Sequence, residues 1–255
     1  MTEEGDINKE DFTTIIFVSD LHYPFIDKKI YRLVIENFIP EVQPQCLILG
    51  GDMIDFYGLS RFSKDPRRAL NTQDDIDGLK EILKNIRELL PDTKIIYLEG
   101  NHEYRMITYK WTKAKEMSYI RALGLENLLG LKELDIQFVS YNKYWNYKKI
   151  YFVHGDVISK HSGYTAKNIL EKWGVNIICG HSHRTGKHNH TTLNGNQGAW
   201  ESGCLCDTSP EYIKGKANWQ QGLSVVDYYK DKIFYVHNID IVKYGFIYNG
   251  KYYTL

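Results

Sequence analysis

The sequence predicts a layered α/β fold with a mixed β-sheet, and two observations support this. Short runs of apolar, often β-branched residues alternate along the chain with stretches in which apolar residues recur at helical spacing. From about residue 191 onward the helical stretches stop, and short strand-like runs follow one another with turn residues between them. Strands and helices in alternation, followed by a β-rich tail, indicate helices packed on a sheet that is not purely parallel.

The first half of the chain alternates strands and helices. The longest predicted helix, Thr72–Leu90, has its apolar residues on one face and Thr72 as a candidate N-cap. Because proline lacks a backbone N–H, Pro40 and Pro91 are expected to end the helices that precede them. In chain order we expect a strand at Thr13–Ser19, a helix at Lys28–Ile39, a strand at Cys46–Leu49, a helix at Thr72–Leu90, a strand at Lys94–Leu98 and a helix from about Glu103 to Leu123.

The second half of the chain carries fewer helical stretches. Residues 1–12 are expected to form a loose N-terminal arm before one domain that spans residues 13–255. We expect strands at Ile136–Ser140, Ile150–Val153 and Asn176–Cys179, a helix at Gly163–Trp173, and strands at Leu223–Asp227, Ile233–His237 and Gly245–Tyr253.

The composition is that of an ordinary globular protein. Of the 255 residues, 43% are hydrophobic and 25% are charged, which excludes a disordered or low-complexity chain. The 32 basic and 32 acidic residues give a formal net charge of zero, so no bulk positive charge points to nucleic acid. No apolar run reaches the roughly 18 to 20 residues of a membrane span, and the acidic N-terminus does not resemble a signal peptide. The four cysteines are too few for a disulfide scaffold, so we expect a reducing, cytoplasmic location.

Aspartate, asparagine and histidine residues follow five of the predicted strands. In open α/β sheets, ligands bind outside the carboxyl ends of the strands, so these side chains are expected to converge on one edge. Carboxylates and imidazoles without cysteine suit manganese, iron or zinc better than copper(I) or an iron–sulfur cluster. The set is too large for one tetrahedral zinc ion and fits two ions that share a carboxylate, an arrangement common in phosphoryl chemistry. The seven candidate ligands are Asp20, His22, Asp52, Asn101, His154, His181 and His183.

These residues lie in five short blocks that resemble the motifs of the calcineurin-like metallophosphoesterase superfamily. The resemblance covers roughly residues 15–184, with all the blocks in order. It implies a four-layer α/β/β/α sandwich with two mixed sheets, the second completed by the β-rich residues 191–255. It also implies hydrolysis of phosphate esters by a hydroxide bridging two metal ions. The blocks are Asp20-x-His22, Gly51-Asp52-x-x-Asp55, Gly100-Asn101-His102-Glu103, His154 and Gly180-His181-Ser182-His183.

The resemblance also implies a role for each residue. Asp20, His22 and His183 would hold the first ion, Asn101, His154 and His181 would hold the second, and Asp52 would bridge the two. Manganese is the expected metal, with iron, zinc, nickel or cobalt as alternatives, since availability often decides. His102 would act as a general acid or as a donor to the phosphoryl group, and Asp55 would orient it. Arg105 is the candidate clamp for the substrate phosphate, because a guanidinium can bind two phosphate oxygens. The alternative for Arg105 is an exposed helix face.

The first two blocks favour one branch of the superfamily. The protein Ser/Thr phosphatases carry arginine after the second aspartate of Gly-Asp-x-x-Asp, whereas this chain has Phe56 there. The chain more nearly resembles phosphodiesterase and exonuclease-like members, in particular a phage-associated group. We therefore expect a phosphodiesterase or nuclease. The alternative is a phosphomonoesterase that acts on nucleotides, sugar phosphates or phosphoproteins. A non-catalytic scaffold is a third reading, but all seven ligand positions hold competent residues.

The expected partners follow from these hypotheses. The substrate is a phosphate ester, with nucleic acid or a nucleotide as candidates, and no membrane is expected. If the chain is phage-encoded, it would act in the cytoplasm of the bacterial host. The tyrosine-rich C-terminal strands could pair across a homodimer, as exposed strand edges can. Aromatic residues interleave with basic ones after His102, and packing of these aromatics against the sheet is favoured over the stacking of bases; they are Tyr104, Tyr109, Trp111 and Tyr119.

Overall fold

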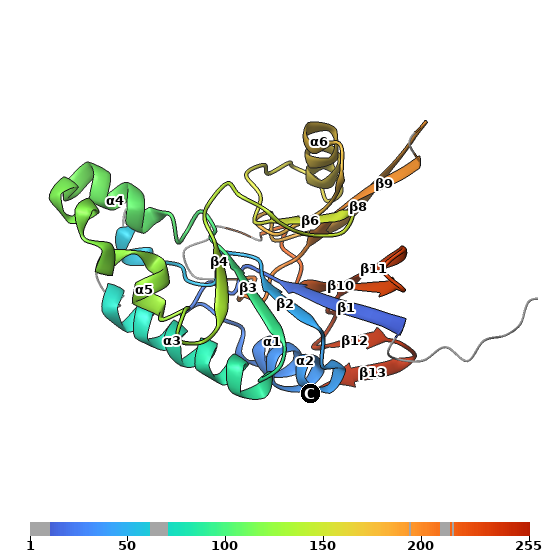
Figure 1. Ribbon diagram of the computed structural model, residues 1–255, viewed down its shortest axis with the longest axis horizontal. Helices are drawn as coiled ribbons and strands as arrows, with labels where there is room; N and C mark the ends of the chain where they lie inside the picture. The colour runs from blue at the N-terminus through green and yellow to red at the C-terminus, as the bar shows by residue number, and fades with distance from the viewer. Residues whose placement is uncertain (1–10, 62–70, 194, 210–214, 216) are drawn as a thin grey trace, which may run out of the picture.

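The computed structural model describes residues 11–61, 71–193, 195–209, 215 and 217–255. Two β-sheets face each other, and helices cover the outer face of each, which gives four layers in the order α/β/β/α (Figure 1). The predicted fold class is thus confirmed. Residues 1–10 of the expected arm lie outside the described residues, but Phe12 already belongs to the first strand, where it pairs with Tyr229.

The first sheet has six strands in the order β11-β10-β1-β2-β3-β4. Strands β1 to β4 run parallel, as expected for strands joined by helical crossovers, and β10 pairs antiparallel with the free side of β1. The bounds are β1 Phe12–Val18, β2 Cys46–Leu49, β3 Lys94–Leu98, β4 Ile136–Val139, β10 Gly222–Tyr229 and β11 Ile233–Asp240.

The second sheet has five strands in the order β5-β6-β7-β9-β8. The three central strands are parallel, and an antiparallel strand closes each edge. The apolar pattern indicates only β6 and β7, because β5 is short and most of β8 is exposed. The bounds are β5 Trp145–Tyr147, β6 Ile150–Val153, β7 Asn176–Cys179, β8 Thr185–Thr192 and β9 Gly195–Ser202.

The expectation that residues 191–255 complete the second sheet is wrong for most of that segment. Of this segment, only β9 and the last residues of β8 belong to the second sheet, whereas β10 and β11 extend the first sheet. The physical reason is the free edge of β1, which β10 covers over six paired residues from Phe12 to Phe17. The predicted strand Gly245–Tyr253 is a separate hairpin that turns at Asn249 and Gly250, with bounds β12 Gly245–Tyr248 and β13 Lys251–Thr254.

The first helical segment continues past the proline that was expected to end it. It consists of α1 Lys28–Tyr31, a π-helical stretch Arg32–Phe38 and α2 Ile39–Val42. The N–H of Ile39 bonds to Val34 O, five residues back, so the wider turn directly precedes Pro40. The missing N–H of Pro40 then falls in the first turn of α2, where proline is tolerated. The segment ends instead at Gln43, which is left-handed with φ 52°.

The remaining helices lie close to their predicted places. Helix α3 spans Thr72–Leu89, and its N-cap is Asn71 rather than Thr72, since the Asn71 side chain accepts the N–H of Asp74. The predicted helix from Glu103 to Leu123 is shorter, because α4 ends at Lys113 and two 3₁₀ turns follow. The other bounds are the 3₁₀ turns Tyr57–Leu59, Lys115–Tyr119 and Arg121–Leu123, and the helices α4 Arg105–Lys113, α5 Leu125–Leu129 and α6 Tyr164–Trp173.

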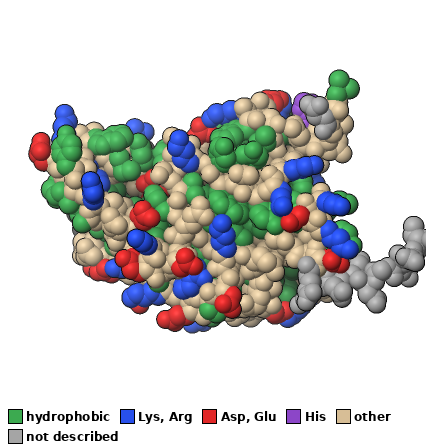
Figure 2. Space-filling model, viewed as in Figure 1, with side chains coloured by type: hydrophobic (Ala, Val, Ile, Leu, Met, Phe, Trp, Pro, Cys, Tyr) green, Lys and Arg blue, Asp and Glu red, His purple; other side chains and the backbone are tan. Residues whose placement is uncertain are grey.

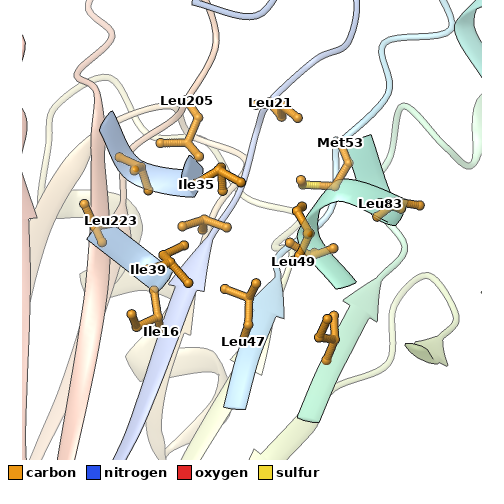
Figure 3. Packing of buried hydrophobic residues seen from close by; sticks show 14 of the residues in the cluster. Ile16, Leu21, Ile35, Ile39, Leu47, Leu49, Met53, Leu83, Leu205 and Leu223 are labelled. Carbon is orange, nitrogen blue, oxygen red and sulfur yellow. The ribbon is translucent and has the colours of Figure 1, made fainter. Parts of the chain in front are cut away.

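The apolar core is divided among the layers. The largest cluster lies between the first sheet and its helices, where Leu47 and Leu49 of β2 face Ile39 and Leu83 (Figure 3). A second cluster fills the space between the two sheets and includes the near-parallel rings of Phe17 and Phe152, whose centroids are 6.1 Å apart. A third cluster lies between α6 and the second sheet. Strands buried on both faces explain the continuous apolar runs in the sequence.

Candidate metal centre

The loops that follow β1, β2, β3, β6 and β7 meet at one edge of the two sheets. Backbone hydrogen bonds connect them, from Asp20 N–H to Gly51 O over 3.0 Å and from Gly180 N–H to His154 O over 3.0 Å. The convergence that the sequence predicts is therefore present. All seven candidate ligands are buried or partly buried at this edge: Asp20, His22, Asp52, Asn101, His154, His181 and His183.

Five of these residues have backbone conformations that side chains other than glycine rarely adopt. The φ angles of Asp20, His22, Asp52, His181 and His183 lie between 51° and 67°. Such conformations cost of order 1–3 kcal/mol each and persist where the surrounding structure imposes them, often at functional sites. Their clustering at one edge indicates that the fold holds these side chains in place.

The first ligand group contains Asp20, His22, Asp52 and His183, whose ligating atoms lie within 4.8 Å of one another. The Nε2 atoms of His22 and His183 are 3.0 Å apart, and His183 Nε2 is 3.0 Å from Asp20 Oδ1. His22 Nδ1 lies 3.1 Å from Asp55 Oδ2, so a proton on Nδ1 leaves the Nε2 lone pair directed at the group. Oδ1 of Asp20 is buried without a hydrogen-bond donor among the described residues.

The second ligand group surrounds Asp52 on its other side. The ligating atoms of Asp52, His154 and His181 lie within 4.8 Å of one another. His154 Nε2 is 3.0 Å from Asn101 Oδ1 and 3.3 Å from Asp52 Oδ2. Its other ring nitrogen, Nδ1, donates to Gly50 O over 2.9 Å, which leaves Nε2 as the ligating atom.

The donor set fits a pair of divalent cations. In each group, imidazole nitrogens and amide or carboxylate oxygens, all of them atoms that can ligate a metal, lie within hydrogen-bonding distance of one another. A cation between the atoms would satisfy all of them at once. Asp52 belongs to both groups and is the residue placed to contact two ions.

The charges at this edge favour added positive charge. Burial alone would raise the pKa values of Asp20 and Asp52, but His183 beside Asp20 and His154 beside Asp52 hold both well below the ordinary range. Burial opposes protonation of His154, yet the nearby carboxylate of Asp52 raises its pKa to about 9. For His181, burial and the neighbouring His154 lower the pKa to about 4, so it is neutral and ready to ligate at pH 7.

His102 and Asp55 lie beside the ligand groups. His102 Nδ1 lies 3.1 Å from Oδ2 and 3.1 Å from the backbone O of Asp55, and its Nε2 is 3.8 Å from Asp52 Oδ2. Oδ2 of Asp55 therefore faces both His102 and His22. The His102 side chain is 17% exposed, which leaves it accessible to a substrate.

Arg105, the predicted phosphate clamp, is engaged within the protein. Its Nη1 donates to Asp55 O over 2.8 Å and lies 3.3 Å from Asp55 Oδ1. Its Nη2 donates to His102 Nε2 over 2.9 Å. The side chain is 21% exposed, so these contacts do not enclose it fully. Contact with a substrate phosphate remains a prediction.

Glu103 belongs to the Gly-Asn-His-Glu block, but the sequence assigns it no role. Its carboxylate is fully buried and accepts the backbone N–H groups of Asp52, Met53 and Gly100 over 2.8–3.0 Å. The hydroxyl of Tyr97 donates to it as well, over 2.8 Å. Burial and the charge of Asp52 raise the pKa of Glu103 to about 7. Glu103 thus joins the loops that carry Asp52 and Asn101 without being a ligand itself.

Glu201 fixes the loop that carries His181 and His183, and nothing in the sequence indicates this role. It is fully buried on β9. Its Oε2 accepts the hydroxyl of Ser182, which stands between His181 and His183, over 2.7 Å. Its Oε1 accepts the N–H groups of Gly163 and Ala166, at the start of α6, over 2.7 and 3.2 Å. Because Glu201 and Ser182 lie on different segments, 19 residues apart, only the folded chain brings them together.

Two glycines of the motifs are explained by close approach to the aspartates. A Cβ atom on Gly100 would lie 2.2 Å from Asp52 Oδ1, and one on Gly180 would lie 2.6 Å from Asp20 Oδ2. Neither position has room for a side chain.

The chain is similar in sequence to known proteins. The family model for "Calcineurin-like phosphoesterase" matches residues 13–245. The chain is 29% identical over 225 residues to the Gene 54 protein of Mycobacterium phage L5, covering 83% of this chain and 88% of the phage protein. The Gene 54 protein of Mycobacterium phage D29 is 29% identical over 224 residues, with the same coverage.

Solved structures resemble the chain more distantly. Vps29 from Entamoeba histolytica, solved in complex with zinc, has a TM-score of 0.46 at 10% identity, covering 91% of this chain and 94% of Vps29. A dimetal phosphatase from Danio rerio has a TM-score of 0.39 at 12% identity, covering 88% of this chain and 98% of that protein.

Proposed function

The chain belongs to the calcineurin-like phosphoesterase family, and on this premise we propose that it is a phosphoric ester hydrolase that depends on two divalent metal ions and prefers diesters. The observation that carries the proposal is the position of Asp52 between two groups of converging lone pairs. Manganese is the first candidate for both ions, with iron, zinc, nickel or cobalt as alternatives. The dinuclear arrangement, the metal and the diester preference are our proposal.

Each ligand has a place in this proposal. Asp20, His22 and His183 would hold one ion, and Asn101, His154 and His181 would hold the other. Asp52 would contact both. When bound, the two ions would lower the pKa of a water molecule for attack on phosphorus and offset the charge that develops on the phosphoryl oxygens.

The residues beside the ligands would protonate the leaving group and bind the phosphoryl group. His102 would give a proton to the oxygen that leaves from Nε2, which is partly exposed and accepts from Arg105 in the structure, after a substrate displaces Arg105 and this nitrogen takes up a proton. The Asp55 carboxylate fixes the ring through Nδ1. Arg105, which contacts His102 Nε2 with one NH₂ group, is placed to bind the same phosphoryl group once a substrate separates the two.

The diester preference rests on the sequence of the second block. The protein Ser/Thr phosphatases have arginine after the second aspartate, and Phe56 occupies that place here with its side chain fully buried. A buried phenylalanine cannot bind the extra charge of a monoester. The alternative is a phosphomonoesterase of nucleotides, sugar phosphates or phosphoproteins, with Arg105 supplying the positive charge.

The cellular setting is also a proposal. The two phage relatives favour a protein encoded by a phage that acts in the cytoplasm of the bacterial host. The structure shows no helix, within the residues it describes, that is long and apolar enough to cross a bilayer.

The direct test compares two chromogenic substrates. Turnover of bis(p-nitrophenyl) phosphate and of p-nitrophenyl phosphate is measured with added manganese, with chelator, and with the variant Asp52→Asn. We expect faster turnover of the diester, lost with chelator and in the variant. Faster turnover of the monoester would replace the diester preference with the phosphatase alternative. Activity that survives both chelator and Asp52→Asn would overturn the metal mechanism.

A further inference from the structure

The segment from Arg105 to Leu123, here called the α4 projection, is built unlike the rest of the chain. It starts three residues after His102 and comprises α4 and two 3₁₀ turns, and none of its side chains is buried. In Figure 1 it projects at one end of the molecule, beyond β4 and α5. Only Met106 of this segment packs against the core, so most of its side chains are available for another purpose beside the metal centre.

The α4 projection exposes large apolar side chains. The sequence favoured packing of its aromatic residues against the sheet, and this is wrong for three of them. Trp111 is 52% exposed and Tyr119 is 82% exposed. The physical reason is that α4 lies at one end of the molecule, beyond β4, rather than over the face of the sheet (Figure 1). The exposed apolar residues are Tyr109, Trp111, Met117, Tyr119 and Ile120.

The same surface is basic. Its charged residues are Arg105, Lys110, Lys113, Lys115 and Arg121, against the single acid Glu116. Apolar and basic side chains alternate over this end of the molecule in Figure 2. In a chain of zero net charge this is a local concentration of positive charge. It argues against a second copy of the projection as the partner, since two such surfaces would repel each other.

A row of aromatic rings connects the α4 projection with the metal centre. Trp111 contacts Tyr104 edge-on, with ring centroids 5.9 Å apart. Tyr104 stacks on Tyr141, with centroids 4.6 Å apart and planes inclined by 27°. Tyr141 and the ligand His154 line the same cavity of about 270 Å³. The row thus leads from the second ligand group to the exposed face of Trp111.

We propose that the α4 projection is a binding surface for single-stranded nucleic acid that leads a strand to the metal centre. Exposed aromatic rings stack on unpaired bases of any sequence, and interspersed lysine and arginine residues bind the phosphates between them. A duplex offers its phosphates but not the faces of its bases, so the aromatic residues select the single strand. This binding role rests on the proposed function, which identifies a phosphate ester as the group that is cleaved.

The test measures binding separately from hydrolysis. Binding of a fluorescein-labelled 15-residue oligothymidylate is followed by fluorescence anisotropy with the manganese-loaded chain carrying His102→Ala. A denaturing gel confirms that the probe stays intact. In this background, Trp111→Ala and Tyr119→Ala are each compared with Tyr235→Ala, which removes a tyrosine that is 63% exposed on β11. Circular dichroism melting checks that each variant is folded.

We expect Trp111→Ala to weaken binding at least about fivefold and Tyr235→Ala to leave it unchanged, because the loss of one stacked base is worth roughly 1–3 kcal/mol. Affinity should fall steeply between 50 and 200 mM salt. A duplex of the same length should bind more weakly than the single strand.

Three results would overturn the inference: equal affinity of Trp111→Ala and Tyr235→Ala, equal affinity for duplex and single strand, or no binding of the probe at all. Because the hydrolysis of bis(p-nitrophenyl) phosphate is assayed on its own with the unmodified chain, such a result would leave the proposed function standing. Conversely, binding that depends on Trp111 without any hydrolysis would contradict the proposed function alone.

Discussion

The buried carboxylate of Glu103 accepts the backbone N–H of Asp52, the residue shared by both ligand groups, over 2.9 Å. The two residues come from loops after different strands of the first sheet. The same carboxylate oxygen accepts the N–H of Gly100 over 3.0 Å, so one side chain fixes the distance between the Asp52 loop and the Asn101 loop. The spacing of the candidate ligands Asp52 and Asn101 therefore depends on a carboxylate that is not itself a ligand.

Replacing Glu103 with glutamine should damage the centre although no ligand is removed. One oxygen becomes an NH₂ group that must face backbone donors, and a buried donor without an acceptor costs about 1–3 kcal/mol. We expect a lower melting temperature and a reduced manganese content, measured by calorimetry and by atomic absorption. The control is Glu126→Gln, whose side chain is exposed on α5. An unchanged metal content in Glu103→Gln would show that Glu103 does not position Asp52.

Gly100→Ala tests the contact between the Asp52 loop and the Asn101 loop from the other side. The added Cβ would lie 2.2 Å from Asp52 Oδ1 and 2.3 Å from Asp52 N, so the two loops must separate. Overpacking of this kind costs about 1–3 kcal/mol, and we expect the metal content to fall with the melting temperature. Gly124→Ala is the matched control, since Gly124 also has an ordinary φ, −74°, and its nearest neighbour is 3.2 Å away. A metal-replete Gly100→Ala protein would argue against tight coupling of the loops.

His102→Ala should slow turnover in a way that depends on the leaving group. If His102 gives a proton to the departing oxygen, its loss lowers kcat by about 10²–10⁴-fold for an ester of an alcohol. The effect should be much smaller for p-nitrophenyl esters, because p-nitrophenolate leaves without a proton. Turnover of methyl p-nitrophenyl phosphate is compared with that of an unactivated dialkyl phosphate. His190→Ala, an exposed histidine on β8, should behave like the unmodified chain. Equal losses for both ester types would contradict a general-acid role.

Arg105 connects the proton donor with the phosphate in this proposal, so its removal should change two kinetic parameters. Arg105→Ala removes contacts to Asp55 and His102 of 2.8 and 2.9 Å as well as the charge near the phosphoryl group. Because hydrogen bonds to charged groups are worth about 1.5–3 kcal/mol, we expect kcat/KM to fall by roughly 10–100-fold. A rise in KM alone would indicate phosphate binding, and a fall in kcat alone would indicate support of His102. Arg32→Ala, an exposed residue, serves as the control; unchanged kinetics in Arg105→Ala would remove Arg105 from the site.

The sequence predicts where the candidate ligands lie because each follows a short apolar strand, and the ends of such strands are fixed by the fold. Asp20 and Asp52 could be placed at one edge from β1 and β2 alone. Glu201 could not, because its partner Ser182 lies on another strand's loop and its bonds form only after folding. The position of β10 was missed for a similar reason: local pattern identifies a strand but not the edge it covers. The exposure of Trp111 was also missed, since helical spacing does not show whether a sheet lies beneath the helix.

Metal binding should release protons and strengthen as the pH rises. In the metal-free chain, the Asp52 carboxylate overcomes the effect of burial and raises the pKa of His154 to about 9, so this ring is protonated at pH 7 and an ion must displace its proton. Below pH 9, affinity at the second ligand group should rise about tenfold per pH unit for each proton released. Titration calorimetry in two buffers with different ionisation enthalpies counts these protons. The same heat in both buffers would mean that His154 is already neutral.

The raised pKa of His154 also makes the stability of the metal-free chain depend on pH. A raised histidine pKa stabilises the folded, metal-free chain below the unfolded value of about 6.5, and this stabilisation is lost as the pH rises through about 9. The melting temperature of the chelator-treated chain should therefore fall between pH 7 and pH 9. The manganese-loaded chain should lack this fall, because the ion takes the place of the proton beside Asp52 and Asn101. Parallel melting curves for the two forms across this range would contradict a ligand role for His154.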